Sequence, residues 1–159
     1  MRRILSFVLI IAVLFVFAGC AAADITRPKV DAGATMVDIT GDISVTFEGE
    51  DIVLDVNSNI DDGALIKFSI QSVEGLELAK QIVTKDADTL TVKFDESVLG
   101  DKDEFYAFAS CAPSAYGDQP DSVIEHYGES FEYLQGDSVI WDSTGVVVVY
   151  NSGVIQLNS

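Results

Sequence analysis

The sequence predicts an all-β protein built as an antiparallel sandwich with one short helix. Apolar segments of about four to eight residues recur at spacings of roughly ten, and most of them alternate apolar with polar positions. β-Branched and aromatic side chains dominate these segments, and Gly, Asp or Asn bounds them. This spacing is typical of sandwiches. No interval contains the long amphipathic helix that a crossover between parallel strands requires.

Alternation predicts four strands in the first part of the domain, at residues 43–47, 52–56, 64–71 and 90–94. Residues 105–111 and 146–150 are apolar at nearly every position, which indicates central strands covered on both faces. Shorter strands are expected at residues 139–141 and 154–157. Asn151-Ser152-Gly153 is expected to be a hairpin-like connector between the strands at 146–150 and 154–157.

The one predicted helix lies within residues 117–128. Pro120 stands near its start, acidic residues occupy the first turn and Gly128 closes it, which are helix start and stop signals. Val123, Ile124 and Tyr127 share one face at helical spacing, so we expect this helix to lie across an open edge of the sandwich.

The first twenty residues have the layout of a secretory signal peptide. Two arginines follow Met1, residues 7–18 are an unbroken apolar run, and the stretch closes with Gly19-Cys20. This end resembles the bacterial lipobox, with Phe17 standing where that family usually has Leu. The resemblance implies cleavage before Cys20 and diacylation of its thiol, so that acyl chains anchor the protein.

Two other interpretations of this leader stay open. Residues 4–23 are long enough to cross a bilayer without cleavage, and a plain signal peptide could be cut after an alanine. All three place the rest of the chain outside the cytoplasm. The lipoprotein interpretation divides the chain into a signal peptide (1–19), a tether (20–35) and a β-sandwich domain (36–159), on the outer face of the bacterial plasma membrane.

Charge restricts the partners. The chain carries 26 Asp and Glu against 9 Lys and Arg, for a formal net charge of −17. Nucleic-acid binding depends on lysine and arginine contacts to phosphate, so this composition argues against it. The expected partners are the membrane, through the lipid anchor, and an unknown protein or cell-wall ligand.

Two stretches of the domain resemble a known family. The sequence of residues 59–64, Asn-Ile-Asp-Asp-Gly-Ala, is similar to the Asn-Leu-Pro-Asp-Gly-Thr turn of small immunoglobulin-like β-sandwich modules. Such modules occur in secreted proteins and lipoproteins of Gram-positive bacteria. A second stretch matches at Gln119-Pro120, Val123, Tyr127-Gly128, Leu134 and Gly136, with Phe131 at a position where Gly is usual. The resemblance implies an immunoglobulin-like fold and carries no catalytic residues.

The sequence contains few candidates for catalytic residues. His126 is the single histidine and is expected on the solvent side of the helix, without a partner. Neither a Gly-x-Ser-x-Gly nor a Ser-x-x-Lys motif is present. Cys111 lies in an apolar run and is expected to be a buried small side chain. Trp141 is expected in core or sheet-edge packing rather than as a platform for sugars. We therefore predict no catalytic residues.

Calcium is the best-motivated metal, although its signal is weak. The segment that begins at Asp55 starts like an EF-hand loop but lacks the glycine and glutamate that the loop needs. Asp101, Asp103 and Glu104 cluster oxygens in one turn and are weak calcium candidates. Solvated turn acids that keep a surface protein soluble are the simpler interpretation, so no cofactor is expected.

Anchor, tether and sandwich together predict a membrane-anchored, extracytoplasmic lipoprotein that is a non-enzymatic binding or accessory module of the bacterial cell surface. The alternative is a carboxylate-dependent cell-envelope hydrolase, because paired acids are abundant. A solute-binding lipoprotein is disfavoured by length, since such proteins usually have two lobes.

Overall fold

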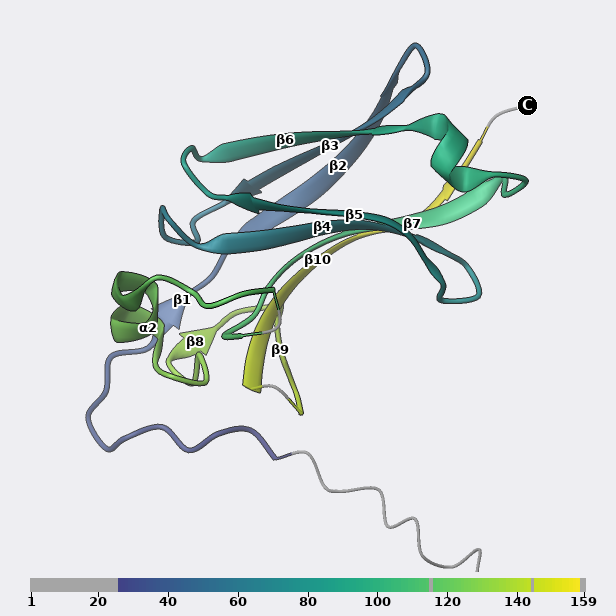
Figure 1. Cartoon of the computed structure of the whole chain (residues 1–159). Helices are drawn as coiled ribbons and strands as arrows, with labels where there is room; N and C mark the ends of the chain where they lie inside the picture. Colours follow the sequence, from purple (N-terminus) through teal and green to yellow (C-terminus); the bar gives the residue numbers. More distant parts are fainter. Residues whose placement is uncertain (1–25, 115, 144, 158–159) are drawn as a thin grey trace, which may run out of the picture.

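Two antiparallel sheets pack face to face, and alternating apolar side chains fill the space between them (Figure 1). The computed structural model describes residues 26–114, 116–143 and 145–157. A five-stranded sheet has the order β5-β4-β7-β10-β9, and a three-stranded sheet has the order β2-β3-β6. The strands are β1 Val37–Asp38, β2 Gly41–Glu48, β3 Asp51–Ser58, β4 Leu65–Ser72, β5 Glu77–Thr84, β6 Thr89–Asp95, β7 Glu104–Cys111, β8 Leu134–Gln135, β9 Val139–Asp142 and β10 Gly145–Gln156.

The all-β sandwich and its alternation register are confirmed. Leu54 on β3, Phe68 on β4 and Val92 on β6 all point into the core and are at most 3% exposed. β5 was not predicted, because as an edge strand it leaves most of its residues exposed and has no clear apolar alternation. A short 3₁₀ helix, η1 (Glu96–Leu99), was also not predicted.

The predicted connector at residues 151–153 is wrong, because β10 runs through it as one strand. β10 pairs with β7 on both sides of a bulge between Asn151 and Val154. At the bulge the Ala107 N–H donates a hydrogen bond to Ser152 Oγ over 3.0 Å, which replaces a ladder bond. Gly153 adopts a φ of 72°, which only glycine adopts readily. The Asn-Ser-Gly signal therefore produces a bulge rather than a reversal.

The short helix is confirmed as α2 (Asp121–Tyr127). Val123 and Tyr127 are fully buried in the core between the sheets, and Ile124 packs beside them. Just before the helix, Gln119 Oε1 accepts a hydrogen bond from the Leu65 N–H (2.9 Å) and Gln119 Nε2 donates one to the Ala112 carbonyl (2.8 Å). This buried amide ties the helical segment to the start of β4 and the end of β7.

The chain enters the domain beside the helical segment. β1 pairs in parallel with β8, and Arg27 donates a hydrogen bond to the Leu134 carbonyl. In Figure 1 the N-terminal segment leaves from the α2 and β8 end, whereas β10 finishes at the opposite end of the sandwich. None of the described helices is long and apolar enough to span a bilayer.

Truncation of Phe68 tests the register. Phe68 is 0% exposed on β4, so Phe68→Ala should lower the free energy of unfolding by about 3–5 kcal/mol. The control Ser44→Ala lies on the solvent side of β2, where a change within about 0.5 kcal/mol is expected. Urea denaturation of both variants measures the difference, and equal losses would contradict the assigned register.

Candidate functional site

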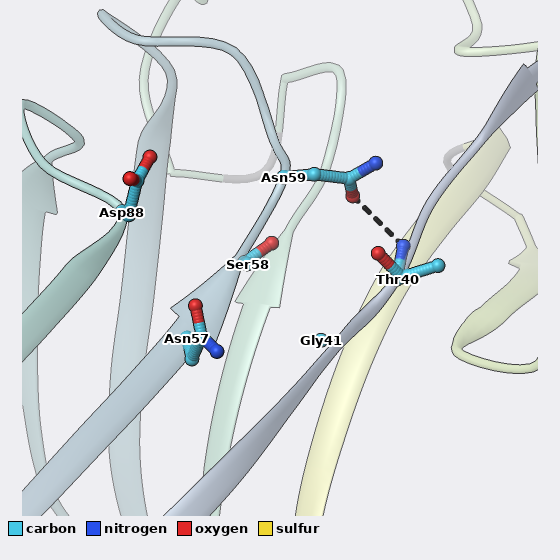
Figure 2. A pocket seen from close by; sticks show the side chains of 6 residues that line it. All are labelled: Thr40, Gly41, Asn57, Ser58, Asn59 and Asp88. Atoms are coloured by element: carbon cyan, nitrogen blue, oxygen red, sulfur yellow. Dashed lines mark hydrogen bonds between the residues drawn. The ribbon is translucent and has the colours of Figure 1, made fainter.

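A polar pocket opens at one end of the three-stranded sheet (Figure 2). Its volume is about 220 Å³, and it is lined by Thr40, Gly41, Asn57, Ser58, Asn59 and Asp88. Asn59 spans it: Oδ1 accepts a hydrogen bond from the Thr40 N–H and Nδ2 donates one to the Asp38 carbonyl, each over 2.8 Å. Asn59 therefore fastens the segment between β1 and β2 to the turn after β3.

The polar groups at the base of this pocket already form hydrogen bonds within the protein. Ser58 Oγ and Tyr150 Oη are hydrogen-bonded at 2.6 Å, and the Ile60 N–H donates to the same Ser58 oxygen. A Cβ atom at Gly41 would stand 2.4 Å from the Asn57 carbonyl oxygen, so only glycine fits there. What remains for a ligand is the exposed edge of Asn57 and Asp88, which is too little for a reaction centre.

His126 has a partner that the sequence did not reveal. Its Nδ1 lies 2.5 Å from Asp61 Oδ2, and the Asp61 N–H donates a hydrogen bond to Tyr127 Oη over 2.6 Å. The expected solvent side is correct, since the His126 side chain is 50% exposed. The expectation of a histidine without a partner is wrong, because Asp61 contacts its ring. Asp61 is 65 residues away along the chain, so no local pattern indicated the contact.

This pair supplies a base and an orienting acid, but a triad also needs a nucleophile. In the described residues no hydroxyl or thiol is hydrogen-bonded to the His126 ring. The Asp61 contacts instead hold the 59–64 turn against α2, which gives the pair a structural role.

Burial controls the ionisation of the core hydroxyls and the thiol. Desolvation raises the pKa of Cys111 from its ordinary value of 9.0 to about 12, although a hydrogen bond from Gln119 opposes the shift. Burial also raises the pKa of Tyr127 and of Tyr150. All three groups are protonated at neutral pH, so Cys111 is the buried small side chain that the sequence predicts and has no thiolate to act as a nucleophile.

The calcium candidates lie at the turn before β7. Asp101 and Asp103 are exposed, and Glu104 Oε1 accepts a hydrogen bond from Gln156 Nε2 over 2.8 Å. Among the residues the structure describes, no three or more His, Cys, Asp or Glu side chains gather in a way that could hold a metal ion. Calcium binding stays an untested prediction.

The outer faces of the two sheets differ in chemistry. The outer face is the set of strand residues that point away from the core. On the five-stranded sheet it carries Tyr106 and Phe108, whose ring centroids lie 5.9 Å apart along β7. Beyond them Tyr116 hydrogen-bonds to Ser110 at 2.8 Å, and Lys67 Nζ lies 5.0 Å from the Tyr116 ring centroid. We call Tyr106, Phe108 and Tyr116 the aromatic row.

Charge separates these faces further. The register puts Lys67, Lys80, Glu77 and Glu104 on the outer face of the five-stranded sheet, with Asp142 at its β9 edge. Glu77 forms ion pairs with both lysines, at 3.0 Å and 2.9 Å. The outer face of the three-stranded sheet has one lysine and five acids: Lys93, Asp42, Glu48, Asp51, Asp55 and Asp95. In a chain of net charge −17, the charges of β4, β5 and β7 around the aromatic row thus cancel, and this part of the face is locally neutral.

Comparison with known proteins adds no relative: no protein-family model matches the sequence, and no curated protein is significantly similar to it. The resemblance of this chain to immunoglobulin-like modules therefore stays a prediction. The structure does give a role to the residues of that resemblance, because Asp61, Gln119 and Tyr127 join the 59–64 turn, β4 and α2.

The Tyr127 hydroxyl should contribute more to stability than the exposed histidine beside it. Tyr127→Phe leaves the part-buried Asp61 N–H without its acceptor, so we expect a loss of about 1–3 kcal/mol in the free energy of unfolding. His126→Ala removes one arm of a solvent-exposed pair and should cost no more than about 1 kcal/mol. Chemical denaturation at neutral pH measures both. A larger loss for His126→Ala would mean that the pair, not the hydroxyl, holds the turn.

Proposed function

We propose that this chain is a lipoprotein of the bacterial cell surface that binds a cell-wall glycan through the aromatic row and performs no chemistry on it. The acyl chains on Cys20 hold it at the outer face of the plasma membrane, and the sandwich is a binding or accessory module. The immunoglobulin-like modules that the sequence resembles suit this role, because they occur in secreted proteins and lipoproteins.

The aromatic row is the observation that carries the proposal. Sugar rings present flat C–H faces that stack on aromatic side chains, while tyrosine hydroxyls offer hydrogen bonds at the rim. Alternate residues of a strand repeat at about 7 Å, so rings at Tyr106 and Phe108 present successive platforms along β7. A linear glycan suits such a row better than a globular protein does.

Electrostatics supports the same surface. Cell-envelope polymers are commonly anionic, and a chain of net charge −17 repels them over most of its area. The outer face of the five-stranded sheet is locally neutral around the aromatic row and presents Lys67 beside Tyr116. The polar outer face of the three-stranded sheet has acids and threonines instead, with Thr91 bonded to Asp55.

The anchor is tested at Cys20. Cys20→Ala should abolish incorporation of radiolabelled fatty acid and leave the chain unprocessed or released, because no other residue supplies the thiol that the lipobox acylates. Cys20→Ser is a closer steric control and should behave in the same way. Labelling that survives either change would rule out the lipoprotein assignment.

The binding surface is tested with isolated cell-wall sacculi and a soluble chain that begins near Asp24, after the leader and Cys20. Tyr106→Leu combined with Phe108→Leu keeps apolar bulk but removes both ring faces. We expect affinity to fall by about tenfold or more, since truncating a central aromatic contact costs about 1–2 kcal/mol. The matched control Ser44→Ala with Thr46→Ala on the other sheet should bind like the parent chain.

Three outcomes of that experiment would oppose the proposal. Absence of binding by the parent chain would exclude a wall glycan as the ligand. Equal loss in the control variant would move the contact to the three-stranded sheet. Degradation of the sacculi that is lost on changing a single carboxylate would favour the cell-envelope hydrolase instead.

A further inference from the structure

The short edge strand β9 carries the most exposed large apolar pair of neighbours in the described chain. Ile140 is 48% exposed and Trp141 is 47% exposed. Consecutive strand residues point to opposite faces of a sheet, so the edge presents apolar surface on both sides. Within the described residues β9 (Val139–Asp142) is the last strand of the five-stranded sheet, beside β10.

This edge lies at the end where the chain enters the domain. Arg27 is hydrogen-bonded to the Leu134 carbonyl on β8, and only residues 136–138 separate β8 from β9. Figure 1 shows the N-terminal segment passing below β8 and β9. The membrane-proximal end of the sandwich, if Cys20 is the anchor, is therefore the end that carries Trp141.

Chain length limits how far this end can stand from the lipid. Cys20 and Arg27 are seven residues apart, and an extended chain covers about 3.3–3.6 Å per residue, so Arg27 stays within about 25 Å of the acylated thiol. A tether of this length keeps β9 within contact range of the bilayer surface while the far end of the sandwich points outward.

We propose that Ile140 and Trp141 insert into the membrane–water interface and hold the domain upright on the bilayer, with the aromatic row open to the side. The occupant is a lipid surface. An indole ring prefers this interface, because its apolar body reaches the acyl boundary while its N–H stays hydrated. This inference rests on the proposed anchor at Cys20 and adds an orientation to it.

The acids near this edge set the depth of the contact. Asp137 precedes β9 and Asp142 ends it, so the strand touches the interface without entering the hydrocarbon. Anionic lipid should weaken the contact through repulsion with the acidic chain, and added salt should restore it by screening.

Fluorescence gives a direct test, because Trp141 is the single tryptophan of the chain. The acylated protein is reconstituted in phosphatidylcholine vesicles, with and without lipids brominated near the headgroup. We expect emission at shorter wavelength than in the soluble chain that begins near Asp24, and loss of intensity with brominated lipid. Ile140→Asp should reduce that quenching while the protein stays bound to vesicles.

A matched control moves the reporter to the other end of the domain. Phe47 is exposed to a similar degree, at 43%, and lies near the C-terminal end of β2. The double variant Phe47→Trp with Trp141→Phe should show no quenching by brominated lipid. Equal quenching in both proteins would mean that the domain has no preferred orientation, which overturns the inference.

Failures of the two proposals are distinguishable. A chain that does not float with vesicles refutes the anchor and with it the orientation. A chain that floats with an unquenched tryptophan refutes the lipid contact alone. A shift to shorter wavelength that grows with protein density, without quenching by brominated lipid, assigns the β9 edge to a second copy of the chain instead.

Discussion

The sandwich depends on how its α2 end is filled. Tyr127, Phe131 and Leu134 come from the segment between β7 and β9, and all three are fully buried in the common core. Tyr127 and Phe131 meet edge to face at 5.4 Å between ring centroids, a favoured aromatic geometry. The Gln119 amide then fixes this segment to the backbone of β4 and to Ala112. Without these groups the core would open to water at one end.

This closure also determines where the surfaces lie. β8 follows directly from the buried segment, and it receives both β1 and Arg27. The chain therefore enters the domain at the closed end, and the edge strand β9 begins within a few residues of the same point. The five-stranded sheet runs away from that point, and Tyr106 and Phe108 are half-buried on its outer face along β7.

Local sequence was sufficient to predict strands whose apolar and polar residues alternate. Alternation at Leu54, Phe68 and Val92 identified inward positions, because a half-buried strand has a period of two. It failed where an element owes its form to a distant partner. β5 is a strand because it pairs with β4, and Ser152 marks a bulge because Ala107 donates to it. The Asp61 contact of His126 crosses 65 residues and leaves no local signal.

The same distinction explains why binding surfaces were harder to predict than the core. Tyr106 and Phe108 alternate with buried alanines on β7, so in sequence they look like one continuous apolar strand covered on both faces. Only the register shows that their rings lie on the outer face, beside Lys67 and away from the acids of the other sheet. Apolar area left on an outer face has to be covered by some partner or tolerated in water. In a chain this acidic, a locally neutral aromatic face is the place where an uncharged or anionic polymer meets the least repulsion.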